Sequence, residues 1–331
     1  MITESGAGTV ADLGEWGLIA ALGSRMPAGP LTAVGIGDDS AVVGAPSGSV
    51  VVAVDLVLEG RHFLRSWSSG YDVGVKAAAR SLADIAAMGA VPTALLVALA
   101  APGSLPARWA LDLAAGVAAE ASRAGAGVVG GDTARADSVL VSVTALGDLD
   151  GRAAVLRGGA SPGDVVAVAG LLGRSAAGHA LLSAGLTSSS SLVAAHLRPA
   201  PPYDAGPEAA RLGATAMIDI SDGLLADLGH VASASGAAID VGTSSLGIFL
   251  GDPLAQAAAD LFSRTGTADS PRALALSWVL TGGEDHSLVA TFPPAAVLPE
   301  RWHAIGSVRP GSGVTVDGAP HCGPGGWEHF T

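Results

Sequence analysis

The sequence predicts a mixed α/β fold (α/β or α+β) that is divided into two domains, 1–150 and 151–331. The first observation is that apolar runs of strand length alternate with helix-length segments in both halves of the chain. The second is the length of 331 residues, which is typical of two domains of about 150 residues each. The third is a rise in polarity over 148–163, after which a strand-like run begins again, so we place the boundary there.

The elements of the first half follow from hydrophobic periodicity and turn residues. Residues 71–88 read as a helix with small residues on several faces, so we expect it to pack closely. The run 93–100 is continuously apolar, as in a buried strand, and Pro106 suits the first turn of a helix. The expected helices are 13–22, 71–88 and 106–124, and the expected strands are 31–36, 50–56, 93–100, 127–129 and 139–146.

Strands and helices alternate again in the second half. The expected strands are 165–169, 216–218, 237–241, 287–292 and 302–308. The expected helices are 174–184, 205–212 and one that runs from near Gly223 to Ser233. Segments 187–191 and 242–245 are expected to be surface loops.

Charge and composition exclude several classes of protein. The chain has 17 basic and 30 acidic residues, a formal net charge of −13, which argues against binding to nucleic acid or to an anionic membrane. The most membrane-like window, 86–101, is short and contains Pro92, so a helix end followed by a buried strand explains it better. The single cysteine, Cys322, allows no internal disulfide, and residues 1–12 carry no secretory signal. We therefore expect a cytoplasmic protein.

Acidic residues recur beside glycines or at the ends of apolar strands. These segments are Gly-Ile-Gly-Asp-Asp at 35–39, Val-Ala-Val-Asp at 52–55, Gly-Gly-Asp-Thr at 130–133, Asp-Ile-Ser-Asp-Gly at 219–223 and Gly-Gly-Glu-Asp at 282–285. A further acid, Asp84, lies inside an apolar helix. Buried carboxylates need partners, and 17 basic residues are too few to pair with all of them. Bound Mg²⁺ is a natural alternative, and glycines let the backbone approach a phosphate.

Ordinary turn chemistry is the competing explanation. Gly-Asp pairs are common in turns, and Asp219 or Ser221 could cap the helix that starts near Gly223. For any one segment this explanation is the better one. All of the segments together favour a single composite site that binds a polyanion with several metal ions.

Other catalytic templates do not fit. The chain lacks a P-loop, an H-E-x-x-H motif and a C-x-x-C pair. A G-x-S-x-G string at 159–163 precedes a strand, so it reads as a turn, and a G-x-G-x-x-G string at 125–130 follows a helix, which is the wrong context for a dinucleotide site. Cys322 reads as a bystander. His62 and Trp327 read as structural residues on their own, although His62 lies close to Asp55 in sequence.

Taken in order, the segments resemble those of the thiamine-monophosphate kinase family over nearly the whole chain, from about Glu15 to Phe330. Further matching segments are Glu-Gly-Arg-His-Phe at 59–63, Leu-Ala-Asp-Ile-Ala-Ala-Met-Gly-Ala at 82–90 and Gly-Trp-Glu-His-Phe at 326–330. The Gly-Gly-Asp segment recurs in the larger superfamily of aminoimidazole-ribotide synthetase-like ATP enzymes. The His-Phe, Gly-Gly-Glu-Asp and terminal aromatic segments together are specific to the kinase.

The resemblance implies a two-domain aminoimidazole-ribotide synthetase-like fold. An N-terminal α/β domain (1–150) would bind ATP and Mg²⁺ and dimerise through its strands, and a C-terminal α/β domain (151–331) would complete the active site. The implied reaction is the phosphorylation of thiamine monophosphate by ATP, which gives thiamine diphosphate and ADP. The γ-phosphoryl group would pass directly and in line, without a phosphoenzyme.

The resemblance also assigns roles to individual residues. The implied magnesium ligands are Asp39, Asp55, Asp84, Asp132, Asp219 and Asp222, and Asp132 and Asp222 are the implied catalytic residues. The implied ATP-binding positions are Gly131, Asp132, Arg157 and Ser221, and the positions near thiamine monophosphate are His62, Glu284 and Trp327. Cations that offset the charge of two anions are what phosphoryl transfer requires.

Two positions depart from the family pattern. Ala53 and Val54 stand where the family has two hydroxyl residues before the aspartate, and Ser81 stands where asparagine is common. Neither change removes a carboxylate, but the first removes a hydroxyl ligand for magnesium. Two alternatives therefore stay open: a superfamily enzyme with another acceptor, and a non-catalytic protein that binds nucleotide or thiamine phosphate.

Overall fold

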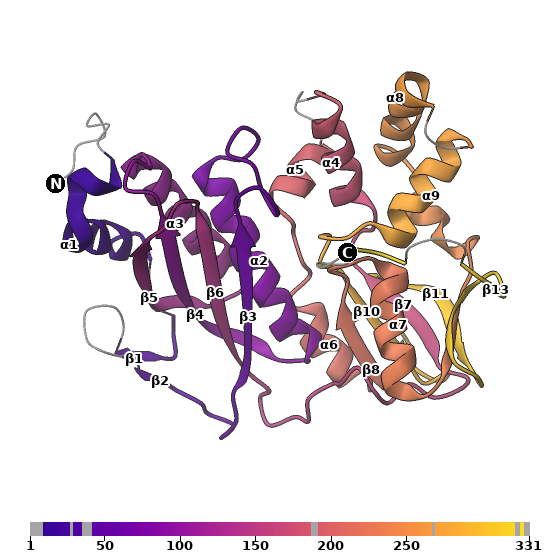
Figure 1. Cartoon of the computed structure of the whole chain (residues 1–331). Helices are drawn as coiled ribbons and strands as arrows, with labels where there is room; N and C mark the ends of the chain where they lie inside the picture. The colour runs from indigo at the N-terminus through magenta and orange to yellow at the C-terminus, as the bar shows by residue number, and fades with distance from the viewer. Residues whose placement is uncertain are drawn as a thin grey trace. The chain divides into compact units, whose positions relative to one another are not determined.

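The computed structural model describes residues 9–26, 29–34, 42–186, 191–266, 269–321 and 325–327 (Figure 1). The chain divides into two compact units. Unit 1 comprises Met1–Ile85 and Val91–Gly151, and unit 2 comprises Ala86–Ala90 and Arg152–Thr331. Strands and helices mix in both units, which confirms the predicted α/β class.

Unit 1 is built on a four-stranded sheet in the order β3-β6-β4-β5. The strands are β3 (Val51–Leu58), β6 (Leu140–Asp148), β4 (Val91–Ala101) and β5 (Gly127–Arg135). Within this sheet β4 and β5 pair in parallel, and the other two neighbouring pairs are antiparallel. Helices α2 (Gly70–Ala87) and α3 (Ala107–Arg123) cover one face, and α1 (Val10–Gly23) packs beside α3 (Figure 1). A separate pair, β1 (Thr32–Val34) and β2 (Val42–Val43), completes the unit.

Close packing between α2 and α3 depends on glycines. A Cβ atom at Gly74 would collide with the carbonyl of Leu113, and one at Gly116 would collide with the carbonyl of Tyr71. The two helix backbones therefore touch directly. This confirms the close packing predicted from the small residues of 71–88.

The sheet face opposite these helices carries exposed apolar side chains. Val52, Val54 and Leu56 alternate with residues that point toward the helices, and Val54 is 64% exposed. Leu96 on β4 lies in the same row as Val54 and is also exposed. Unit 1 thus presents an apolar sheet face, formed by Val52, Val54, Leu56 and Leu96, which the described residues of the unit do not cover.

Unit 2 is built on a seven-stranded sheet in the order β13-β12-β9-β11-β7-β10-β8. The strands are β13 (Ala319–Pro320), β12 (Gly313–Val316), β9 (Ala238–Val241), β11 (Trp302–Arg309), β7 (Val165–Ala169), β10 (Leu288–Phe292) and β8 (Ala216–Asp219). The helices are α4 (Arg174–Ser183), α5 (Ser191–Leu197), α6 (Ala205–Arg211), α7 (Leu224–Ser235), α8 (Leu254–Thr265) and α9 (Pro271–Thr281), with a 3₁₀ turn η1 (Ser245–Phe249). The central strands β7 and β10 are almost wholly buried, which explains their continuous apolar runs.

Most predicted elements are confirmed with small shifts at their ends, and three differences stand out. Residues 130–133 continue strand β5 instead of forming a turn, because β4 supplies their hydrogen-bonding partners. Helices α5, α8 and α9 were not predicted. Of the expected loop 187–191, residue 191 begins α5 and the others lie outside the described residues. Residues 32–34 of the expected strand 31–36 form β1, whereas 35–36 and the rest of the segment 35–39 lie outside the described residues.

Three further predictions concern the apolar window 86–101, the G-x-S-x-G string at 159–163 and Cys322. The window 86–101 is a helix end followed by β4, as expected, and no helix among the described residues is long and apolar enough to cross a membrane. The G-x-S-x-G string forms a turn before β7, in which Asp164 donates its N–H to the Ser161 carbonyl at 3.0 Å. Cys322 lies outside the described residues.

Candidate functional site

In unit 2, two loops and the C-terminal segment meet beside the end of β8. The backbone N–H of Glu284 donates to the Ser221 carbonyl at 2.8 Å, and that of Trp327 donates to the Asp222 carbonyl at 3.0 Å. A Cβ atom at Gly283 would lie 2.5 Å from the Ser221 carbonyl oxygen, so this approach requires glycine. The structure therefore brings together five residues that the sequence predicted for one site: Asp219, Ser221, Asp222, Glu284 and Trp327.

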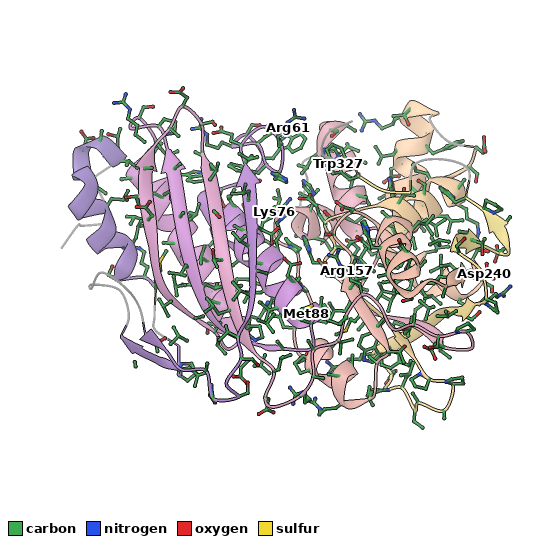
Figure 2. All side chains as sticks on the ribbon, turned by 60° about the horizontal axis from the view of Figure 1, so that its bottom comes forward. Arg61, Lys76, Met88, Arg157, Asp240 and Trp327 are labelled. Atoms are coloured by element: carbon green, nitrogen blue, oxygen red, sulfur yellow. The ribbon has the colours of Figure 1, made fainter. Side chains whose placement is uncertain are left out.

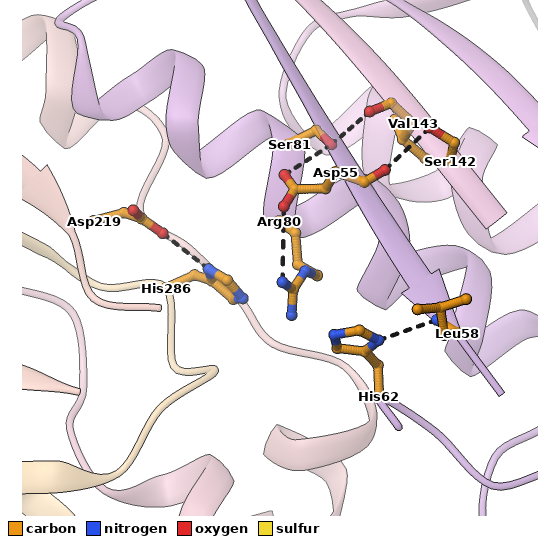
Figure 3. Close-up of polar contacts among 9 residues, drawn as sticks. All are labelled: Asp55, Leu58, His62, Arg80, Ser81, Ser142, Val143, Asp219 and His286. Carbon is orange, nitrogen blue, oxygen red and sulfur yellow. Dashed lines mark hydrogen bonds and ion pairs between the residues drawn. The ribbon is translucent and has the colours of Figure 1, made fainter. Parts of the chain in front are cut away.

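The carboxylates at this end of β8 are closely spaced and poorly solvated. Asp219, the last residue of β8, is 4% exposed, and its Oδ2 lies 3.0 Å from Nδ1 of His286 (Figure 3). Asp227 is also buried, and its carboxylate accepts the N–H groups of Asp222 and Gly223. Burial, followed by the charges of Asp219 and Asp222, raises the pKa of Asp227 to about 8. A cation bound here would relieve this repulsion.

The competing explanation, in which Asp219 or Ser221 caps this helix, does not hold. Helix α7 begins after Gly223, whose φ of 131° places it in a region that favours glycine. Asp227, in the first turn of the helix, satisfies the amides of Asp222 and Gly223. Asp219 and Ser221 are therefore not needed as caps and remain available for other partners. Sequence reasoning overlooked Asp227, although its acidic side chain in a first helical turn is a recognisable signal.

Asp285 is a second residue that sequence reasoning did not assign a role. Its carboxylate accepts the N–H of Gly173 at 2.6 Å and that of Ser175 at 2.8 Å, at the start of α4. Burial raises the pKa of Asp285 to about 7, against the lowering effect of these hydrogen bonds. On either side of it, Glu284 (φ 64°) and His286 (φ 52°) have left-handed backbone conformations.

The side chain of Glu284 meets a buried histidine. Its Oε2 lies 3.6 Å from Nδ1 of His196, which also lies 3.0 Å from the hydroxyl of Ser175. Both contacts are made to the same ring nitrogen, so this set is not a nucleophilic triad, in which the two partners would occupy different nitrogens.

Arg157 and Trp327 are the exposed members of the predicted set in unit 2, and Figure 2 labels both. The residue before Arg157, Leu156, accepts a hydrogen bond from the N–H of Met217, two positions before Asp219. Arg157 therefore lies alongside the edge strand β8. Trp327 is 60% exposed although its backbone is fixed to Asp222.

In unit 1, Asp55 on β3 faces helix α2. The Ser81 hydroxyl donates to Oδ2 of Asp55 at 3.2 Å, and Nη2 of Arg80 lies 3.7 Å from Oδ1 (Figure 3). Asp84 follows Arg80 by one helical turn, so it lies on the same side of α2. Two predicted magnesium ligands, Asp55 and Asp84, thus share one side of unit 1.

His62 lies in the turn that follows β3. Its Nδ1 accepts the N–H of Leu58 at 3.1 Å, and its carbonyl accepts Nζ of Lys76 at 3.3 Å. Lys76, on α2, is 2% exposed. The buried lysine and the Leu58 amide together hold the turn that carries His62.

Asp132 lies far from Asp55 within unit 1. The register runs Asp55–Val143–Val97–Gly131 across four strands, so three strand spacings, about 14 Å, separate Asp55 from Gly131. The next row contains Leu56 and Asp132, whose side chains point to the other face of the sheet. One copy of the sheet therefore cannot bring Asp55 and Asp132 to the same ion.

An apolar cavity of about 110 Å³ lies next to Gly131 and Asp132 in unit 1. Its apolar lining comes from Leu22, Met26, Val97, Leu99 and Leu113. The glycines of 130–131 form part of its wall.

The donor set suits a hard cation. Among the described residues no three His, Cys, Asp or Glu side chains form a ready-made metal site. Mg²⁺ does not require one, because it is usually held by one or two carboxylates together with substrate phosphates and water. Asp55 with Asp84, and Asp219 with Asp222, fit this pattern. Asp39 lies outside the described residues.

Comparisons with known proteins agree on one family. Residues 37–149 match the N-terminal domain of AIR synthase related proteins, and residues 161–265 match the C-terminal domain of that family. A thiamine-monophosphate kinase from Mycobacterium tuberculosis is 47% identical over 325 residues, covering 97% of this chain and 93% of the relative. One from Corynebacterium glutamicum is 38% identical over 333 residues, covering 97% and 95%.

Solved structures give the same result. The crystal structure of thiamine-monophosphate kinase from Stenotrophomonas maltophilia K279a has a TM-score of 0.75 and 32% identity, covering 91% of this chain and 95% of that one. AaThiL complexed with AMPPCP and TMP has a TM-score of 0.75 and 33% identity, covering 96% and 98%. The two-domain fold expected from the sequence is therefore confirmed. The chain belongs to the thiamine-monophosphate kinase family.

Proposed function

We propose that the chain transfers the γ-phosphoryl group of ATP to thiamine monophosphate in a Mg²⁺-dependent reaction. The observation that carries the proposal is the cluster in unit 2, where candidate metal, ATP and substrate residues meet in a chain 47% identical to a thiamine-monophosphate kinase. The AaThiL structure, which is complexed with AMPPCP and TMP, supports the choice of substrates. The use of ATP and the single cysteine both fit the cytoplasm as the setting.

The transfer is direct and in line. A phosphate oxygen of thiamine monophosphate forms a bond to the γ-phosphorus, and the bond from that phosphorus to the β,γ-bridging oxygen breaks. ADP leaves with the electron pair, and no group of the protein becomes phosphorylated. Bound Mg²⁺ would offset the charge of the two phosphate groups and help to align them.

Different residues of the chain bind the metal ions, ATP and thiamine monophosphate. Asp39, Asp55, Asp84, Asp132, Asp219 and Asp222 would hold the cations, with Asp132 and Asp222 as the members that act on the reacting phosphates. Gly131, Arg157 and Ser221 contact ATP, and a guanidinium such as that of Arg157 binds phosphate with two parallel hydrogen bonds. His62, Glu284 and Trp327 contact thiamine monophosphate. The exposed indole of Trp327 is available to stack on the cationic thiazolium ring.

We further infer that the working form is a homodimer. Asp55 and Asp132 lie at opposite edges and on opposite faces of one sheet, so a second copy must supply one of them if both act on the same phosphates. The uncovered apolar face of Val52, Val54, Leu56 and Leu96 suits a self-complementary contact.

Mixing two inactive variants tests this shared arrangement. We expect Asp55→Asn and Asp132→Asn each to be inactive alone. After co-refolding, half of the dimers are mixed, and each mixed dimer holds one intact site, so about a quarter of wild-type activity returns. Absence of any recovery, with mixed dimers demonstrated by native mass spectrometry after one variant has been labelled with ¹⁵N, would argue that each copy works alone.

The reaction itself is tested by incubating the protein with ATP, Mg²⁺ and thiamine monophosphate, and separating the products by chromatography. We expect thiamine diphosphate only when both the metal and the monophosphate are present, with free thiamine as the control acceptor. ADP release with another acceptor would point to a different superfamily reaction. Tight binding of ATP or thiamine phosphate with no turnover would point to a binding protein.

A further inference from the structure

The side chain of His286 is buried in the loop that joins α9 to β10. It is 2% exposed, and its Nδ1 lies 3.0 Å from Oδ2 of Asp219. An ionised carboxylate only accepts hydrogen bonds, so Nδ1 must carry the proton in this contact. One oxygen of Asp219 is thereby engaged, and the other remains for a further partner.

The backbone around His286 holds its ring in one place. The N–H of His286 donates to the Ile220 carbonyl at 2.9 Å, directly beside Asp219. On the preceding side, Asp285 is fixed by the amides of Gly173 and Ser175 at the start of α4. The left-handed conformation of His286 is costly for a residue other than glycine, so these contacts must over-determine it.

The second ring nitrogen points to a ligand. Nε2 of His286 is buried, and it has no hydrogen-bonding partner among the described residues. In the neutral ring with the proton on Nδ1, Nε2 presents a lone pair that can accept a hydrogen bond from an O–H or N–H donor. A buried polar atom without a partner is destabilising, so Nε2 lowers the stability of the folded protein when no ligand is bound.

We infer that His286 is a positioning residue for Asp219: its Nδ1–H orients the carboxylate toward a divalent cation, and its Nε2 accepts a hydrogen bond from the bound ligand or its water. This inference rests on the proposed function, in which Asp219 is a magnesium ligand. Histidine and carboxylate pairs of this kind commonly set the orientation of metal-binding groups.

Two substitutions separate the functions of the ring. His286→Asn keeps an amide N–H near the position of Nδ1 and tolerates the left-handed backbone, whereas His286→Phe removes both nitrogens. We expect His286→Phe to weaken Mg²⁺ binding about 10-fold, measured by calorimetry with AMPPCP present, and His286→Asn to weaken it less than about threefold. The matched control is His303→Asn, because His303 packs its ring on Phe249 and should leave Mg²⁺ affinity unchanged. Equal Mg²⁺ affinity in all of these proteins would overturn the inference.

A measurement on the wild-type protein keeps the test valid if His286→Phe does not fold. In the protein with ¹⁵N-labelled histidine, we expect the His286 resonance, assigned by its loss in His286→Asn, to show a protonated Nδ1 and an unprotonated Nε2. Addition of Mg²⁺ and AMPPCP should shift the Nε2 signal. A proton on Nε2 would overturn the inference. Neither readout depends on product formation, so failure of the kinase assay alone would overturn the proposed function and not the role of His286.

Discussion

At the scale of single residues, the acidic side chains near β8 differ in what surrounds them. Asp219 has His286 as a partner, whereas Asp227 is buried beside two other acids and, among the described residues, accepts the backbone amides of Asp222 and Gly223. The sequence could single out the Asp-Ile-Ser-Asp-Gly segment as a candidate site. It could not reveal which acid would be the least well solvated, because that depends on burial within the fold.

The pKa of Asp227 leads to a pH-dependent stability. Because the pKa is about 8 in the folded chain and 3.8 in the unfolded chain, the folded state holds a proton that the unfolded state has lost between these values. Without metal ions, stability should therefore fall as the pH rises from about 4 to 8. Asp227→Asn keeps an acceptor for both amides, so in EDTA at pH 8 we expect its Tm to exceed that of the wild type by about 3–6 °C. Thermal unfolding across this pH range checks the prediction. If the Tm of the two proteins changes with pH in the same way, the prediction is contradicted.

The departure at Ala53 and Val54 can also be tested residue by residue. Ala53 lies on the same side of β3 as Asp55, whereas Val54 points to the exposed face. We expect Ala53→Thr to lower the Mg²⁺ concentration for half-maximal activity severalfold, because the hydroxyl stands beside the carboxylate. Val54→Thr is the matched control and should not lower it. If both variants behave alike, the hydroxyl at this strand has no role in metal binding.

At the scale of elements, the sequence predicted well wherever an apolar pattern had a clear period. Strands β7 and β10 and helix α7 are close to their expected bounds. Strand β5 was underestimated because glycines suggest a turn, yet pairing with β4 outweighs the poor strand propensity of Gly130 and Gly131. Helix α9 was missed although Ser270 caps its N-terminus and Pro271 occupies its first turn, which are recognisable signals.

The contact between α2 and α3 should be sensitive to a single methyl group. Gly116→Ala places a Cβ against the Tyr71 carbonyl, so we expect a loss of roughly 2 kcal/mol or more in unfolding free energy, measured with urea. The control is Gly229→Ala in α7, where the added Cβ meets nothing within 4 Å. That variant should be slightly more stable than the wild type, because alanine favours the helix. Equal effects of the two substitutions would contradict direct contact between the helix backbones.

At the scale of the whole molecule, the order of motifs along the chain was enough to predict the family. It was not enough to predict how the motifs meet. Asp55 and Asp132 both follow or lie within apolar strands, but their separation depends on strand order, which the sequence pattern does not give. The grouping of Asp222, Glu284 and Trp327 likewise depends on backbone contacts between segments far apart in sequence.

The proposed homodimer leads to a prediction about molecular mass. Val54→Lys places a charge in the middle of the apolar sheet face, so we expect it to shift the protein from dimer to monomer in analytical ultracentrifugation. Val297→Lys is the control, since Val297 is highly exposed and lies outside that face. A dimer that persists in Val54→Lys would mean that the copies meet elsewhere.

The burial of Lys76 has a practical consequence for the chemistry of the chain. It is the only lysine in 331 residues, and it is 2% exposed in the folded protein. Amine-directed acylating reagents should therefore label the native protein only at its amino terminus. Acylation of Lys76 itself would report local opening around α2 and the turn of His62, whose carbonyl accepts its Nζ, so mass spectrometry could follow this opening with a single natural probe.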